Sequence, residues 1–352
     1  SLILLKPGEA QPLAAMAGKL KAEAAAWTVS ALSIDAGALG RVEGEASWSL
    51  DGGEPAHIAL QTRRIDGAGL LARDPLGEAA GALGWLERFL PDLDVTLAAD
   101  QLSFRGEEAT EGRLQLQRRA KAWRIAGGQV KFSGATVRVQ ASGDAGLRAV
   151  LDAPDLRRIA LAMQRLEMHQ GLAEDIAALG QIAASVELQP RPGAPGGVKG
   201  EWRIASWEAQ GRFGQARGAG ELSSERLSLT GTLTGAELLF LVRPLAALAT
   251  IIPQDLGIEM TGSALTIADS APGSGRIAAQ REGGRWRMNE MEGSGFGGLA
   301  ASLKRSQQEP GFALALSAPR ADAISALAER LIERRQITQG LRAIRGLSLI
   351  HI

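Results

Sequence analysis

Residues 92–106 read DLDVTLAADQLSFRG, and a related stretch begins 163 positions later at Asp255. At the same spacing Trp123-Arg124 falls on Trp286-Arg287, and after a shift of two residues Leu151-Asp-Ala-Pro154 falls on residues 316–319. Sequence repeats of this length are typical of stacked units that bury their apolar surface against one another. The duplication therefore predicts a modular architecture and not a single cavity built around one active site.

Apolar and polar residues alternate with a period of two through both copies, as in Leu114 and Leu116 or Val137 and Val139. This period is typical of antiparallel strands with one apolar and one polar face. Glycine-containing stretches at 126–128 and 133–135 predict hairpin turns. The fold class we expect is mainly β with helical inserts: duplicated antiparallel β units, curled into an elongated groove or taco-like sheet.

Helical spacing of apolar residues predicts a helix over 156–166 after Pro154, and its copy over 324–331. Residues 70–90 predict a weaker helix. A further apolar run at 236–252 is too short and too interrupted by Arg243-Pro244 to cross a bilayer, and it either caps the end of a sheet or touches lipid.

Proline and glycine between Pro190 and Gly197 mark the linker between the copies. The domains we predict are residues 1–190, a first β-rich unit, and residues 191–346, a second one. Residues 347–352 resemble a translated cloning end, so we expect a non-native tail that packs poorly.

Tryptophan followed by a polar and then an apolar residue occurs four times, at Trp27, Trp123, Trp202 and Trp286. A strand residue that packs its indole on a sheet face explains the motif most simply, because buried rings contribute much of a core's area. A role in stacking on a ligand is the alternative.

The composition excludes several classes of function. Lys+Arg and Asp+Glu both number 39, so there is no basic excess for nucleic acid. The chain has no cysteine, hence no disulfide or thiolate metal site, and His57 and His169 lack the partners of a zinc site. No nucleophile elbow, phosphate loop or zinc-protease motif occurs. We therefore expect a protein that is not an enzyme and has no cofactor.

Residues 92–106, the segment GRLQL at 112–116 and the glycine-rich GGQVKFSG at 127–134 resemble the C-terminal region of AsmA-family proteins. The resemblance covers roughly residues 60–175 and 230–335, and the second copy has Gly257 where the first has Asp94. The wider group, with the TamB-like proteins, implies a β groove in the periplasm of a Gram-negative bacterium, attached to the inner membrane by an anchor outside this fragment. It also implies a part in phospholipid transport between the inner and outer membranes and in outer-membrane biogenesis.

The expected partners are phospholipid, the inner membrane and envelope proteins. The lipid-contacting candidates alternate with polar neighbours and so share a face within each strand; they are Leu97, Leu114, Leu116, Val130, Val137, Val139, Leu227, Leu229, Phe312 and Leu314. Alternation is equally compatible with a periplasmic scaffold or interaction module whose apolar faces close into a β core and leave no lipid conduit. Few aromatic residues make a carbohydrate-active enzyme the weakest of the three interpretations.

Overall fold

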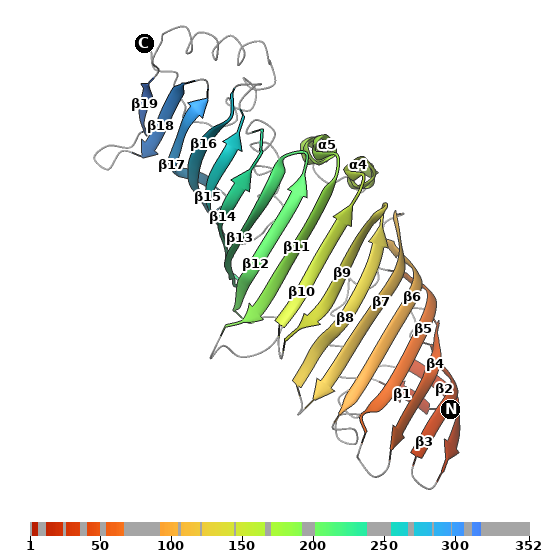
Figure 1. Ribbon diagram of the computed structural model, residues 1–352. Helices are drawn as coiled ribbons and strands as arrows, with labels where there is room; N and C mark the ends of the chain where they lie inside the picture. Colours follow the sequence, from red (N-terminus) through yellow and green to blue (C-terminus); the bar gives the residue numbers. More distant parts are fainter. Residues whose placement is uncertain are drawn as a thin grey trace. The chain divides into compact units, whose positions relative to one another are not determined.

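The computed structural model describes residues 2–5, 12–23, 26–35, 41–49, 54–66, 92–104, 107–119, 122–143, 146–165, 170–191, 201–237, 255–266, 271–283, 285–296, 298–305 and 312–317. These residues form nineteen strands and two helices, so the chain is mainly β as expected (Figure 1). Contacts divide it into two compact units, Ser1–Leu151 and Asp152–Ile352. This division follows the density of contacts and not the sequence repeat, so it does not test the domain boundary predicted between residues 190 and 191, which stays a prediction.

Unit 1 is a sheet in which each strand pairs with the next one in sequence (Figure 1). Its strands are β1 (Leu2–Leu5), β2 (Pro12–Ala22), β3 (Ala26–Asp35), β4 (Arg41–Ser49), β5 (Ala56–Asp66), β6 (Leu93–Phe104), β7 (Glu107–Arg119), β8 (Ala122–Phe132), β9 (Ala135–Ser142) and β10 (Gly146–Ala153).

Unit 2 begins with two helices, α4 (Leu156–Arg165) and α5 (Gln170–Leu179), and continues with strands that each pair with the next one in sequence. Its strands are β11 (Ile182–Pro190), β12 (Trp202–Gly211), β13 (Gly214–Leu222), β14 (Arg226–Thr234), β15 (Asp255–Leu265), β16 (Gly273–Glu282), β17 (Arg285–Phe296), β18 (Leu299–Arg305) and β19 (Phe312–Ser317).

One pairing in each unit is parallel, which corrects the expectation of wholly antiparallel units. β5 pairs with β6 in parallel, Ala56 opposite Leu93, and β14 pairs with β15 in parallel, Leu227 opposite Leu256. A parallel step needs a long connection to carry the chain back to the same end of the sheet. The connections 67–91 and 238–254 supply that length at the same place in each copy.

The duplication extends to irregularities of the backbone. β3 has a bulge between Val29 and Leu32, and β12 has one between Ile204 and Trp207, at the matching place after the repeated tryptophan. A second pair of bulges interrupts β7–β8 after Gln115 and β16–β17 after Ala278, which are 163 residues apart. Because a bulge adds a residue and re-aims a strand, its reproduction in both copies indicates one inherited unit.

The predicted turn at 133–135 is confirmed. Ser133 and Gly134 have φ values of 48° and 84°, the positive values that a two-residue hairpin turn between right-twisted strands requires. The turn predicted at 126–128 is wrong, because those residues lie inside β8. There Ala126 is the extra residue between the partners of Gln115 and Leu116, so the glycines accompany a bulge.

The helix predicted over 156–166 is α4. Arg157 donates its backbone N–H to Asp155 Oδ1 at 3.1 Å, which caps the first turn. α4 and α5 lie side by side (Figure 1), and they pack through Ala160, Met163 and Ala173. Of the apolar run predicted at 236–252, the structure describes the first two residues, and Glu237 pairs with Thr266 beyond the end of β15. The other predicted segments lie outside the described residues: 70–90, 238–252, 324–331 and the tail at 347–352.

Candidate functional site

The sheet of unit 1 carries one apolar face, and the strand registers align it from strand to strand. One cross-strand row runs Leu20, Val29, Ala46, Ile58, Val95, Leu116 and Ile125. The next row runs Leu60, Leu97, Leu114, Gly128 and Val139, and Val130 lies opposite Val137. All six unit 1 candidates, Leu97, Leu114, Leu116, Val130, Val137 and Val139, therefore share this face.

The sheet of unit 2 repeats the arrangement. A row runs Leu188, Ile204, Gly220, Leu229, Ile258, Ala279 and Met288, and Leu227 lies on the same face between Leu222 and Leu256. Leu314 lies opposite Leu303 at the β18–β19 pair, and Phe312 is two residues away on the same strand. The candidates of unit 2 thus also share a face, although the side chains of Phe312 and Leu314 are not among those described.

The opposite faces are polar. In unit 2 the row Glu208, Arg217, Thr232, Thr261, Arg276, Glu292 and Ser302 crosses seven strands without an apolar residue. Ion pairs join neighbouring strands on this side, as between Arg276 and Glu259 and, in unit 1, between Lys131 and Glu111 at 2.6 Å. Over these seven strands of unit 2, one face is therefore apolar and the other polar.

Burial of the apolar faces is uneven. Leu93 is 2% exposed and Ala56 is 3% exposed, and with Val95 they form a closed cluster onto which Trp48, Ile58 and Leu116 pack. Leu97 and Val137 on the same face are 36% and 37% exposed. A part of the face is thus an ordinary core, and another part is open to a ligand or to solvent.

The exposed large apolar side chains among the described residues are concentrated on these faces. Leu20, Leu97, Trp123, Val137 and Met291 all project from them by register, and Leu161 of α4 is the remaining one. Leu20, Trp123 and Met291 were not among the sequence candidates. Trp123 carried a signal in the repeated tryptophan motif, whereas Leu20 and Met291 could be assigned to the face only from the registers.

The tryptophans of the repeated motif all lie in strands, as predicted. Trp27 in β3 lies opposite Trp48 in β4, with ring centroids 5.9 Å apart. Trp123 and Trp286 lie opposite Arg118 and Arg281, so each copy places one arginine on its apolar face at the same register position. Arg118 is 3% exposed and belongs to the closed part of the face.

The polar face of unit 1 holds a cluster of ionisable side chains. Asp94 Oδ1 forms an ion pair with Arg119 Nη2 at 2.7 Å. The other carboxylate oxygen, Asp94 Oδ2, lies 3.6 Å from His57 Nδ1. Ser47 lies opposite His57 across the β4–β5 pair. The His57 side chain is 58% exposed, so this row is open to water. Among the described residues there is no group of three acidic or histidine side chains that could hold a metal ion.

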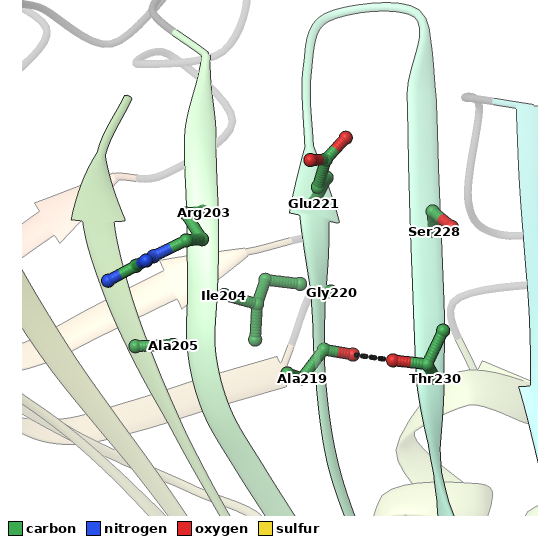
Figure 2. A pocket seen from close by; sticks show the side chains of 8 residues that line it. All are labelled: Arg203, Ile204, Ala205, Ala219, Gly220, Glu221, Ser228 and Thr230. Carbon is green, nitrogen blue, oxygen red and sulfur yellow. Dashed lines mark hydrogen bonds between the residues drawn. The ribbon is translucent and has the colours of Figure 1, made fainter. Parts of the chain in front are cut away.

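A shallow hollow of about 490 Å³ lies at the β12 bulge (Figure 2). Arg203, Glu221 and Ser228 line it on the polar side, and Thr230 donates to the carbonyl oxygen of Ala219 at 3.3 Å. The Trp207 indole N–H donates to the same oxygen at 3.2 Å. The hollow is thus a consequence of the bulge, with hydrogen bonds that link its strands.

Neither helix that the structure describes has the length and apolar content needed to cross a membrane.

The chain matches no protein-family model and no curated protein. Among solved structures, a sex pheromone precursor from Lactobacillus salivarius subsp. salivarius UCC118 is 9% identical over 72% of this chain and 70% of that chain, with a TM-score of 0.16. The sex pheromone staph-cAM373 precursor is 8% identical over 72% of this chain and 77% of that chain, with a TM-score of 0.15. TM-scores this low carry no argument about fold or function.

Proposed function

We propose that this protein is a non-enzymatic lipid-binding module of the AsmA-like type, in which the apolar strand faces of the two units hold the acyl chains of phospholipid. The observation that carries the proposal is the open part of an otherwise continuous apolar face, where Leu97 and Val137 keep more than a third of their surface. Monomeric proteins rarely leave large contiguous apolar surfaces to water, and those that do use them for binding.

The energetics suit an acyl chain. Each CH₂ group moved from water to an apolar surface contributes about 0.8 kcal/mol, so a chain of about sixteen carbons has a large gross driving force. A face that is apolar across many neighbouring strands can contact the whole length of an acyl chain, whatever head group the lipid carries. If the strands of each unit curl into a groove, the acyl chain would lie along the cross-strand rows that contain Leu97 and Leu229.

In the cell the proposal places the protein in the periplasm of a Gram-negative bacterium, attached to the inner membrane, where it would contribute to phospholipid transport and outer-membrane biogenesis. The resemblance of residues 92–134 to the AsmA-family C-terminal region supports this placement.

The second candidate function is a periplasmic scaffold with a closed core and no lipid conduit. The cluster of Ala56, Leu93 and Val95 favours it, because those side chains are already buried as they would be in an ordinary sandwich.

Mass spectrometry of phospholipid bound to protein purified from the periplasm tests the proposal. We expect wild type to carry phospholipid and Leu97→Asp to carry much less, because a carboxylate set against acyl chains costs several kcal/mol. Thr96→Asp is the matched control, since Thr96 is the adjacent residue of β6 and lies on the polar face opposite Gln115. Lipid-free wild type, or equal loss in both variants with folding intact by circular dichroism, would contradict the proposal and favour the scaffold.

A further inference from the structure

The apolar face of unit 2 contains a cross-strand row with two methionines. Met260 on β15 lies opposite Ile277 on β16, and Ile277 lies opposite Met291 on β17, so the three residues form one row, called here the methionine row. It shares its face with the row of Leu229, because Met260 is two residues along β15 from Ile258, the partner of Leu229. Met291 is 42% exposed and Met260 is half-buried. The row is therefore accessible to small molecules in solution.

The matching row of unit 1 has no methionine. At the repeat spacing of 163 residues, the counterparts of Met260, Ile277 and Met291 are Leu97, Leu114 and Gly128. The strand registers agree with this alignment, since the three counterparts also form a row across β6, β7 and β8. The two units thus have the same row on their apolar faces with different chemistry, because thioethers are present in unit 2 alone.

The third methionine whose side chain the structure describes is enclosed. Met163 is 7% exposed and packs between α4 and α5. Methionine is a common filler of irregular gaps in a core, and a filler is covered by its neighbours as Met163 is. Met291 is not covered in this way, so gap filling does not account for it.

A methionine on an open apolar face can be changed from apolar to polar by a mild oxidant. With hydrogen peroxide, the sulfur atom attacks one peroxide oxygen, the O–O bond breaks, the S–O bond of a sulfoxide forms and water leaves. Sulfur loses two electrons and the peroxide gains them. A sulfoxide set against an acyl chain without a hydrogen-bond donor weakens the contact. The leucines and the glycine of the unit 1 row cannot undergo this reaction.

We propose that the methionine row is a redox switch of the lipid site: peroxide converts Met291 and Met260 to sulfoxides, and unit 2 releases its acyl chain while unit 1 keeps its own. This inference rests on the proposed function, because it requires phospholipid on the apolar faces of both units. A methionine sulfoxide reductase, with a dithiol as the reductant, converts the sulfoxides back to thioethers with loss of water, so the switch is reversible.

Peroxide treatment of lipid-loaded protein purified from the periplasm tests the proposal. Mass spectrometry measures the phospholipid retained per chain and the sulfoxide at each methionine. We expect wild type to lose part of its phospholipid. Leu97→Asp protein, in which unit 2 holds the remaining lipid, should retain about tenfold less than before treatment.

Met260→Leu/Met291→Leu should carry the same amount of phospholipid before and after peroxide, because leucine has a similar volume and no thioether. Met163→Leu is the matched control, since it also removes a methionine but leaves the row intact, and it should lose lipid as wild type does. In wild type, sulfoxide should form faster at Met291 than at Met163, and bound phospholipid should slow its formation at Met291.

Equal lipid loss from wild type and the Met260→Leu/Met291→Leu variant overturns the proposal, as does oxidation of Met291 at the same rate with and without phospholipid. Loss of the circular dichroism signal on oxidation also counts against it, because lipid release would then follow from unfolding. Wild type that carries no phospholipid contradicts the proposed function itself. Wild type that keeps its phospholipid after Met291 is oxidised contradicts only the switch.

Discussion

A Cβ atom on Gly218 would lie 1.8 Å from the carbonyl oxygen of Thr230, so β13 and β14 approach one another more closely there than any other residue permits. Gly44 holds the matching place in the first copy, where a Cβ would lie 1.9 Å from the carbonyl oxygen of Ala59. Gly44 pairs with Leu32 and Gly218 pairs with Trp207, and each of these partners is the first paired residue after a bulge. The close approach is thus part of the repeated unit.

We predict that Gly218→Ala and Gly44→Ala each destabilise their sheet by about 2 kcal/mol or more, because the neighbouring backbone must move to admit the methyl group. Gly257→Ala is the control, since the nearest atom to a Cβ there is 3.4 Å away, and it should be neutral or slightly stabilising. Urea unfolding, monitored by circular dichroism, measures the free energy of unfolding of the three variants. Equal effects at all three positions would show that backbone entropy and not the close approach matters.

Part of this architecture follows from the sequence. Alternation at Leu114–Leu116 and Val137–Val139 predicts strands with one apolar face because side chains in a strand point alternately to its two sides. Alternation says nothing about which strands are neighbours, so the parallel β5–β6 and β14–β15 pairs could not be predicted. It also cannot distinguish the closed end of β6 from its open middle, because what covers a residue comes from elsewhere in the chain.

The missed features have equally local causes. Gly127-Gly128 looks like a turn, yet the two residues remain paired within β8, and the irregularity there is a bulge in which Ala126 is the extra residue. α5 was not predicted because its first turn carries no acidic residue and no serine, threonine or proline marks its start.

Trp207 gives a second test of the bulge. Its indole N–H donates to the Ala219 carbonyl oxygen at 3.2 Å, and its ring lies over Gly231, where a Cβ would be 2.9 Å from Cζ2. Trp207→Phe should cost about 1 kcal/mol for the lost hydrogen bond, and Trp207→Ala about 2–3 kcal/mol because the ring contact is lost as well. Urea unfolding checks both, and an alanine variant no worse than the phenylalanine one would show that the ring does not stabilise the sheet.

We predict that the stabilising effect of Asp155 at the start of α4 is lost in acid. A side-chain hydrogen bond from Arg157 lowers the pKa of this carboxyl below its ordinary value of 3.8. A group whose pKa is lower in the folded state stabilises that state above the unfolded pKa and stops doing so as the pH falls through the folded pKa. Asp155→Asn keeps an oxygen for the Arg157 N–H but has no charge to lose.

We therefore expect wild type to melt at a higher temperature than Asp155→Asn at neutral pH, and the difference to shrink below pH 3.8 as the carboxyl becomes protonated. Thermal melts across this range measure it. Glu201→Gln is the control, because the exposed ion pair of Glu201 with Arg191 joins two strand ends and its loss should change the melting temperature little. A difference that persists unchanged in acid would contradict a role for the charge.

Leu93 and Leu97 provide the sharpest test of whether the apolar face of unit 1 is open. Both lie on β6, four residues apart and on the same face, yet Leu93 is 2% exposed and Leu97 is 36% exposed. Leu93→Ala should cost about 2–5 kcal/mol, because it leaves a cavity beside Ala56 and Val95. Leu97→Ala should cost about 1 kcal/mol or less in lipid-free protein, since that side chain already meets solvent. With phospholipid bound, the cost at Leu97 should rise while the cost at Leu93 stays the same, because only the former would contact acyl chains. Urea unfolding of delipidated and lipid-loaded protein measures both, and equal losses at the two positions in the delipidated state would mean that the face is a closed core throughout.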